Sequence, residues 1–194
     1  KHSSPRVGCR AYIMLLAALS LFAAVAHADN FAVLVAGSNG FYNYRHQADV
    51  CHAYQILTRN GIDPDNIITM SYDDVASSSD NPFPGKLYNK PTAQGIPGVD
   101  VYEGCKIDYS GLDVTPENFL AIITGDEETA TGKVLKSGSK DHVFINFVDH
   151  GAVGLIAFPD GELYADELNK ALLEMESKNM YKELVFYLEA CESG

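Results

Sequence analysis

Two apolar segments of this sequence end in residues that could act together in covalent catalysis. Residues 141–149 lead to His150 and Gly151, and residues 183–189 lead to Ala190 and Cys191. If both segments are parallel strands, their carboxyl ends lie at the same edge of the sheet. A thiolate at Cys191 could then attack a carbonyl carbon while His150 accepts or balances the proton.

Acyl transfer also needs hydrogen-bond donors for the oxyanion that forms in the transition state. Gly151 permits an exposed backbone N–H beside His150, and the N–H of Cys191 is available where its strand ends. These two amides are the candidate oxyanion hole. The alternative from pattern alone is that Cys191 is a small buried hydrophobe and His150 an ordinary hydrogen-bonded side chain.

A third polar segment, residues 37–46, follows the first apolar run and contains Asn43, Arg45 and His46. The alternative for Arg45 and His46 is simply the start of a surface helix.

Other polar residues have plainer interpretations. We interpret Cys51 as helix packing and the acidic pair at residues 73–74 as a solvated turn. The cysteines form no Cys-x-x-Cys pair, and we expect neither a metal site nor a cofactor. The glycines after the first predicted strand do not have the G-x-G-x-x-G or Walker spacing of nucleotide-binding loops, so we do not expect a nucleotide-binding protein.

The elements that position these groups follow from hydrophobic periodicity. Continuous apolar runs predict strands at the four segments 31–36, 66–72, 141–149 and 183–189, with the first of them central in its sheet. Helices are predicted at residues 44–60, 115–123 and 165–178. Thr115 is the expected cap of the second helix, with Pro116 at its first position. Residues 155–158 and 163–164 flank a turn and predict a hairpin.

This order of elements predicts a single α/β domain with a mostly parallel central sheet and helices on both faces. A long segment, residues 73–113, is rich in turn-forming residues, lacks periodicity, and is typical of a functional or mobile loop. We expect the sequence to stop, at Gly194, before the last strands of the sheet.

The charge balance restricts the partners of the protein. The 194 residues contain 14 Lys and Arg against 26 Asp and Glu, a net charge of −12. No basic surface for a phosphate backbone is therefore expected, and nucleic acid is excluded as a partner. An excess of carboxylates reduces self-repulsion at acidic pH, which would suit a lysosome or vacuole.

Residues 1–28 have the layout of a secretory signal peptide. Three basic residues precede an apolar run at residues 11–25, and Ala26-His27-Ala28 is a small-x-small cleavage pattern. The run is shorter than the roughly 20 residues of a membrane span, so we expect cleavage after Ala28 and no stable membrane anchor. Residues 29–194 then contain three cysteines, and this odd number leaves at least one thiol without a partner in the chain.

Several motifs resemble the legumain (asparaginyl endopeptidase) family of cysteine peptidases, in order from about Asn30 to Gly194. The most specific are Asn-Tyr-Arg-His at residues 43–46 and Glu-Ala-Cys-Glu-Ser-Gly at residues 189–194. The others include DNPFPG, DVTPENFLAIITGD, GKVLKSG, DHVFINFVDHG and FPDGEL. Where some members have Arg-Gly-Asp, this sequence has Thr124-Gly125-Asp126, so integrin binding is not expected.

The resemblance implies a caspase-like fold and cleavage after asparagine, and after aspartate at more acidic pH. It implies a catalytic dyad of Cys191 and His150, assisted by Asn43. Arg45, His46 and Glu189 would line the S1 pocket. There a cation, an imidazole and a carboxylate can hydrogen-bond to both the oxygen and the NH₂ group of a carboxamide. Asp149 matches the family aspartate that forms a succinimide and is linked to peptide ligase activity; its alternative role is to orient a neighbouring side chain.

The resemblance further implies a proenzyme with a C-terminal prodomain and a lysosomal, vacuolar or secreted location. Its partners would be protein and peptide substrates and cystatin-type inhibitors. Two alternatives remain open from the sequence. A catalytic subunit of the GPI-anchor transamidase shares the fold and the dyad, and a noncatalytic homologue would bind without turnover.

Overall fold

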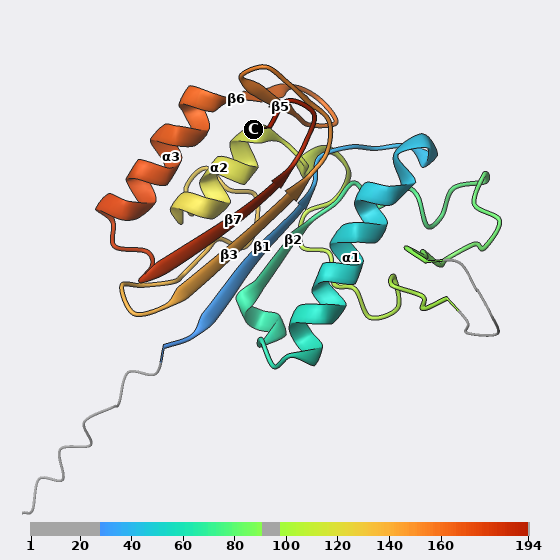
Figure 1. Cartoon of the computed structure of the whole chain (residues 1–194), viewed down its shortest axis with the longest axis horizontal. Helices are drawn as coiled ribbons and strands as arrows, with labels where there is room; N and C mark the ends of the chain where they lie inside the picture. Colours follow the sequence, from blue (N-terminus) through green and yellow to red (C-terminus); the bar gives the residue numbers. More distant parts are fainter. Residues whose placement is uncertain (1–27, 91–97, 194) are drawn as a thin grey trace, which may run out of the picture.

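A four-stranded parallel sheet forms the centre of the protein (Figure 1). The computed structural model describes residues 28–90 and 98–193, so the predicted signal peptide lies outside the described residues except for Ala28. The strand order is β2-β1-β3-β7. The strands are β1 (Asn30–Ala36), β2 (Ile67–Met70), β3 (His142–Val148) and β7 (Glu183–Glu189). All four predicted strands are confirmed, with β1 in the interior of the sheet.

Helices cover both faces of this sheet, as predicted (Figure 1). Helix α1 (Tyr44–Arg59) packs on one face, and α2 (Pro116–Thr124) and α3 (Ala165–Ser177) pack on the other. In β1, Ala32 and Leu34 face α1, whereas Val33 and Val35 belong to the core beneath α2 and α3. A strand buried on both sides has no polar face, which explains its continuous apolar sequence.

The helix ends follow the expected local chemistry. Thr115 Oγ1 accepts a hydrogen bond from the Asn118 N–H at 3.1 Å, and Pro116 is the first residue of α2. Gly125 ends this helix with a φ of 69°, a left-handed conformation that favours glycine. On α3, Met175 is fully buried, and Leu168 and Leu172 pack against the same core. No helix among the described residues is long and apolar enough to cross a membrane.

A small antiparallel sheet of order β4-β5-β6 follows the third strand of the central sheet. Strands β5 (Leu155–Ala157) and β6 (Glu162–Tyr164) are the predicted hairpin. Strand β4 (Gly151–Ala152) was not predicted, because two residues are too few to show periodicity. It pairs Gly151 with Ile156 and so fixes the backbone directly after His150.

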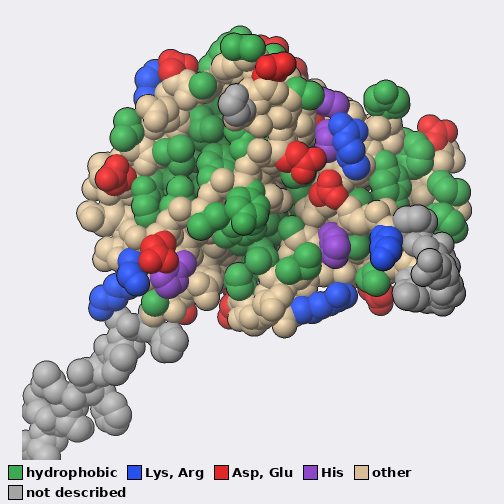
Figure 2. Space-filling view, in the orientation of Figure 1, with side chains coloured by type: hydrophobic (Ala, Val, Ile, Leu, Met, Phe, Trp, Pro, Cys, Tyr) green, Lys and Arg blue, Asp and Glu red, His purple; other side chains and the backbone are tan. Residues whose placement is uncertain are grey.

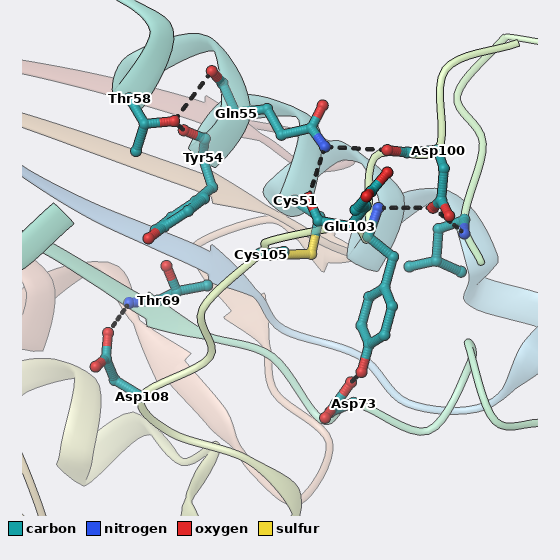
Figure 3. The surroundings of a disulfide bond; sticks show 12 residues. Cys51, Tyr54, Gln55, Thr58, Thr69, Asp73, Asp100, Glu103, Cys105 and Asp108 are labelled. Atoms are coloured by element: carbon teal, nitrogen blue, oxygen red, sulfur yellow. Dashed lines mark hydrogen bonds between the residues drawn. A yellow bond between two sulfur atoms is a disulfide. The ribbon is translucent and has the colours of Figure 1, made fainter. Parts of the chain in front are cut away.

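The long loop after β2 is tied to α1 by a disulfide between Cys51 and Cys105 (Figure 3). The interpretation of Cys51 as helix packing alone was therefore wrong, because its buried sulfur also forms a covalent link to a residue 54 positions away. In the same region the side-chain amide of Gln55 donates to the carbonyl oxygens of Asp100 and Glu103, at 3.0 and 2.9 Å. Cys191 is the free cysteine among the described residues, as the odd number predicted.

The acidic pair at residues 73–74 is not the solvated turn that the sequence predicted. Asp73 accepts a hydrogen bond from the Tyr102 hydroxyl at 2.8 Å; burial and this carboxylate raise the pKa of Tyr102 to about 12. Asp74 accepts from the Gly40 N–H at 2.8 Å and from Gln47 at 2.7 Å. Both carboxylates are half-buried and bind other segments of the chain.

Removal of the disulfide is expected to destabilise the protein. The link closes 54 residues of chain, and the loop-entropy model assigns about 4 kcal/mol to a loop of this length. Cys105→Ala in the full-length protein should lower the free energy of unfolding by up to about this amount in denaturant titrations. A reducing agent should lower the stability of the wild type and not that of the variant. Equal stability of the two proteins without reductant would contradict a structural role for the bond.

Candidate active site

The parallel register brings the two candidate catalytic residues to one edge of the sheet. Strands β3 and β7 pair residue by residue up to Val148 opposite Glu189, and the Asp149 N–H continues the ladder by donating to Glu189 O at 3.0 Å. His150 and Cys191 are each two positions beyond that last pair. On the face shown in Figure 2, histidine, acidic and basic side chains gather at the end toward which the strands run.

Gly151 allows the two strand ends to approach closely. A Cβ at this position would lie 2.8 Å from the carbonyl oxygen of Cys191 and 3.0 Å from the Cβ of Ala190. Real Cβ atoms do not approach a backbone oxygen this closely, so only glycine fits here without a shift of the chain. The backbone of Gly151 is therefore in direct contact with the residue that would be the nucleophile.

Asn43 orients the imidazole of His150. Its amide nitrogen donates to the carbonyl oxygen of Asn39 at 2.9 Å, which turns its Oδ1 toward His150 Nε2 at 2.8 Å. Because an amide oxygen can only accept, Nε2 carries the hydrogen, and Nδ1 of the neutral ring has a free lone pair. His150 and Cys191 are both exposed, which suits a base and a nucleophile that must reach a substrate.

His46 lies beneath this surface in the first turn of α1, with its residue only 1% exposed. Its Nδ1 is 2.6 Å from Ser38 Oγ and 3.1 Å from Asp149 Oδ1. Its ring packs edge-on against that of His150, with 5.2 Å between the centroids and 76° between the planes. Asn43, directly before α1, and His46, in its first turn, therefore both contact His150.

The other two residues predicted for S1 are exposed. Arg45 lies in the first turn of α1, and Glu189 is the last residue of β7. A further carboxylate, Asp49, lies one helical turn after Arg45. Burial raises the pKa of Asp49, a hydrogen bond from Asn89 lowers it, and the negative charge of Glu189 adds to the rise. Helix α1 thus carries a cation and a carboxylate, and the carboxyl end of β7 carries a second carboxylate.

One cluster of potential metal ligands occurs within residues 28–90 and 98–193. His46, Asp149 and His150 each offer a ligand atom, and these atoms lie within 4.8 Å of one another. One nitrogen of each imidazole already makes a hydrogen bond, to Ser38 and to Asn43 respectively. The contacts that the structure shows are those of a hydrogen-bonded protein site.

Ser38 is the functional candidate that the sequence analysis did not single out. It lies in the polar segment after β1 and is only 5% exposed, yet serines are common in such turns and carry no signal of their own. Its neighbour Gly37 is constrained: a Cβ there would lie 2.6 Å from the Ala157 carbonyl oxygen and 2.9 Å from Asp149 Oδ2. The segment after β1 is therefore packed directly against Asp149.

A thiol and an imidazole at adjoining ends of parallel strands, in a sheet flanked by helices, are the arrangement expected of a cysteine peptidase with a caspase-like fold. Comparison with known families agrees with this class. The model of the Peptidase C13 family matches residues 30–194, and the chain belongs to that family.

Individual relatives cover nearly the same part of the chain. Legumain of Rattus norvegicus is 56% identical over 169 residues, which are 85% of this chain and 38% of that protein. Hemoglobinase of Schistosoma mansoni is 57% identical over 166 residues, 86% of this chain and 37% of the relative. Vacuolar-processing enzyme of Vicia sativa is 49% identical over 168 residues, 84% of this chain and 33% of the relative. The chain spans less than two fifths of the length of these relatives.

Proposed function

We propose that the protein is a cysteine endopeptidase that cleaves after asparagine, and after aspartate at acidic pH, with Cys191 as nucleophile and His150 as base. The observation that supports the proposal most is the β3–β7 register together with the close approach of Gly151 to Cys191, since both favour a site in which thiol, imidazole and backbone amides meet at one edge of the sheet. The similarity to legumain and hemoglobinase supports the peptidase class. It does not favour the transamidase alternative.

The proposed reaction follows from the hydrogen bonds of the site. His150 Nδ1 accepts the thiol proton of Cys191, and the thiolate attacks the carbonyl carbon of the substrate. The N–H groups of Gly151 and Cys191 would stabilise the oxyanion of the tetrahedral intermediate. The imidazolium then donates its proton to the leaving amine, and water hydrolyses the thioester to regenerate the thiol. Throughout, Asn43 holds the His150 ring through Nε2.

The proposed S1 pocket is formed by Arg45, His46 and Glu189. The guanidinium of Arg45 can donate to the carbonyl oxygen of an asparagine side chain, and the carboxylate of Glu189 can accept from its NH₂ group. Since both side chains are exposed and His46 is buried, His46 would support the pocket from behind. Peptide ligation is not part of this proposal, because the Asp149 side chain is buried against His46 and Gly37.

The remaining parts of the proposal concern the whole protein. Residues 1–28 would be a signal peptide and residues 29–194 the N-terminal part of the catalytic domain. We propose synthesis as a proenzyme with a C-terminal prodomain, delivery to a lysosome or vacuole, or secretion, and inhibition by cystatin-type proteins. The name vacuolar-processing enzyme of one relative supports the compartment. The substrates would be proteins and peptides.

The test uses the full-length protein, incubated at acidic pH and assayed on peptides that differ only in the residue before the scissile bond. Asn, Asp, Lys and Leu are compared. Cleavage is expected after Asn, with cleavage after Asp only at the more acidic pH, and prior treatment with iodoacetamide should abolish both. Preference for Lys or Leu, or activity that survives alkylation, would contradict the proposal.

A further inference from the structure

Three buried polar side chains, Ser38, His46 and Asp149, form a cluster beside His150, the proposed base, and Ser38 has no assigned role. Ser38 Oγ and Asp149 Oδ1 both approach the same atom, Nδ1 of His46, at 2.6 and 3.1 Å. All three residues are 5% exposed or less. Asp149 Oδ1 is buried and receives no well-directed hydrogen bond from a described residue, so its only compensation is the polar ring edge beside it.

These distances determine which ring nitrogen of His46 carries the hydrogen. A lone pair on Nδ1 would face the acceptor Asp149 Oδ1 at 3.1 Å, which is repulsive in a site with little water. A hydrogen on Nδ1 instead donates to Ser38 Oγ at 2.6 Å and presents its positive dipole to the carboxylate. The hydroxyl and the carboxylate together therefore select one tautomer and one rotation of the imidazole.

The fixed ring of His46 restrains the ring of His150. The two imidazoles pack at 76° with their centroids 5.2 Å apart, an edge-to-face arrangement of the kind that aromatic rings prefer. Asn43 holds His150 by its Nε2, and a single hydrogen bond still allows rotation about its axis. The contact with His46 restricts that rotation, so the His150 ring is held from two sides.

We propose that Ser38 is a positioning residue for the base: with Asp149 it clamps His46, and the clamped ring orients His150 for proton transfer with Cys191. This inference rests on the proposed function. The inference also distinguishes two roles for His46. If His46 lined the S1 pocket, it would govern substrate preference; if it positions His150, it governs the rate of the chemical step. The low exposure of His46 favours the second role.

The test compares Ser38→Ala and Ser38→Thr in the full-length protein. Loss of the hydroxyl is expected to lower kcat about tenfold, part of the 10²- to 10⁴-fold contribution of acid–base catalysis. KM and the ratio of cleavage after Asn to cleavage after Asp should stay unchanged. The alkylation rate of Cys191 by iodoacetamide, followed by mass spectrometry of its peptide, should fall with kcat. Ser38→Thr keeps the hydroxyl and should retain more of both rates.

Ser137→Ala is the matched control, because Ser137 is also buried and its hydroxyl donates to Met180 O at 2.6 Å, outside the site. It should lose stability without losing kcat or alkylation rate. Equal losses in Ser38→Ala and Ser38→Thr, a changed preference for Asn over Asp, or an unchanged kcat in Ser38→Ala would each overturn the inference. Failure of the wild type to cleave after Asn would instead overturn the proposed function, while the alkylation comparison would still test the clamp.

Discussion

Replacement of Cys191 by alanine is expected to reduce cleavage after asparagine by about 10⁴-fold or more, since removal of a nucleophile eliminates the covalent route. Cys191 is an exposed residue two positions after β7, so the substitution removes no core packing. The midpoint of thermal unfolding should stay close to that of the wild type. The measurement is kcat/KM on the asparagine peptide, with active-site titration to exclude contaminating wild-type enzyme.

Two further variants make this prediction specific. Cys191→Ser keeps a nucleophilic atom of similar size but a much less acidic one, and it should also lose nearly all activity. Ser193→Ala changes a neighbouring exposed side chain and should retain activity. If Cys191→Ala kept even a tenth of the wild-type rate, Cys191 would not be the nucleophile.

The fold could be predicted because its signals are local or periodic. The apolar sequence of β1 reflects burial on both faces, and Thr115 and Gly125 mark the two ends of α2 through contacts within a few residues. The parallel sheet with helices on both faces follows from the alternation of strands and helices, since parallel strands need crossover connections, whereas the order β2-β1-β3-β7 comes from the structure. The same alternation predicts that His150 and Cys191 follow neighbouring parallel strands, and in the structure each lies two residues beyond the pairing of Val148 with Glu189.

The parts that could not be predicted depend on contacts between distant segments. The disulfide partner of Cys51 could not be predicted, because the loop that carries Cys105 has no periodic structure from which the distance between the two cysteines could be inferred. The residues next to Asp73 predict only a solvated turn, because its partner, the Tyr102 hydroxyl, is 29 positions away. In each case the side chain of an ordinary loop residue acquires its role only from the tertiary fold.

The same limit applies inside the candidate site. Asn43 and His46 could be named from the resemblance, but their contacts could not. The structure adds that Asn43 bonds Nε2 of His150 and that His46 is buried against Ser38 and Asp149. Burial is decisive for His46, because a sequence motif cannot distinguish a side chain that meets the substrate from one that supports the residue in front of it.

The second large effect is expected at Gly151, where no chemical group is removed. In Gly151→Ala the added Cβ would lie 2.8 Å from the Cys191 carbonyl oxygen and 3.1 Å from that of Leu155. Both contacts are with backbone atoms, so the strand ends must separate, and a misplacement of about 1 Å in a reacting group costs about 10²-fold in rate. We expect kcat to fall by about this factor, with a smaller change in KM because Arg45 and Glu189 are untouched.

Gly138→Ala is the matched control for this effect. A Cβ at Gly138 meets nothing closer than Asp141 Oδ2 at 3.8 Å, which is ordinary van der Waals contact, and the position lies in the connection before β3 rather than at its catalytic end. It should retain the wild-type kcat. If Gly151→Ala were as active as Gly138→Ala, the close approach of the two strand ends would not be needed for catalysis. Since the oxyanion donors proposed here are the amides of those same strand ends, their assignment would have to be abandoned as well.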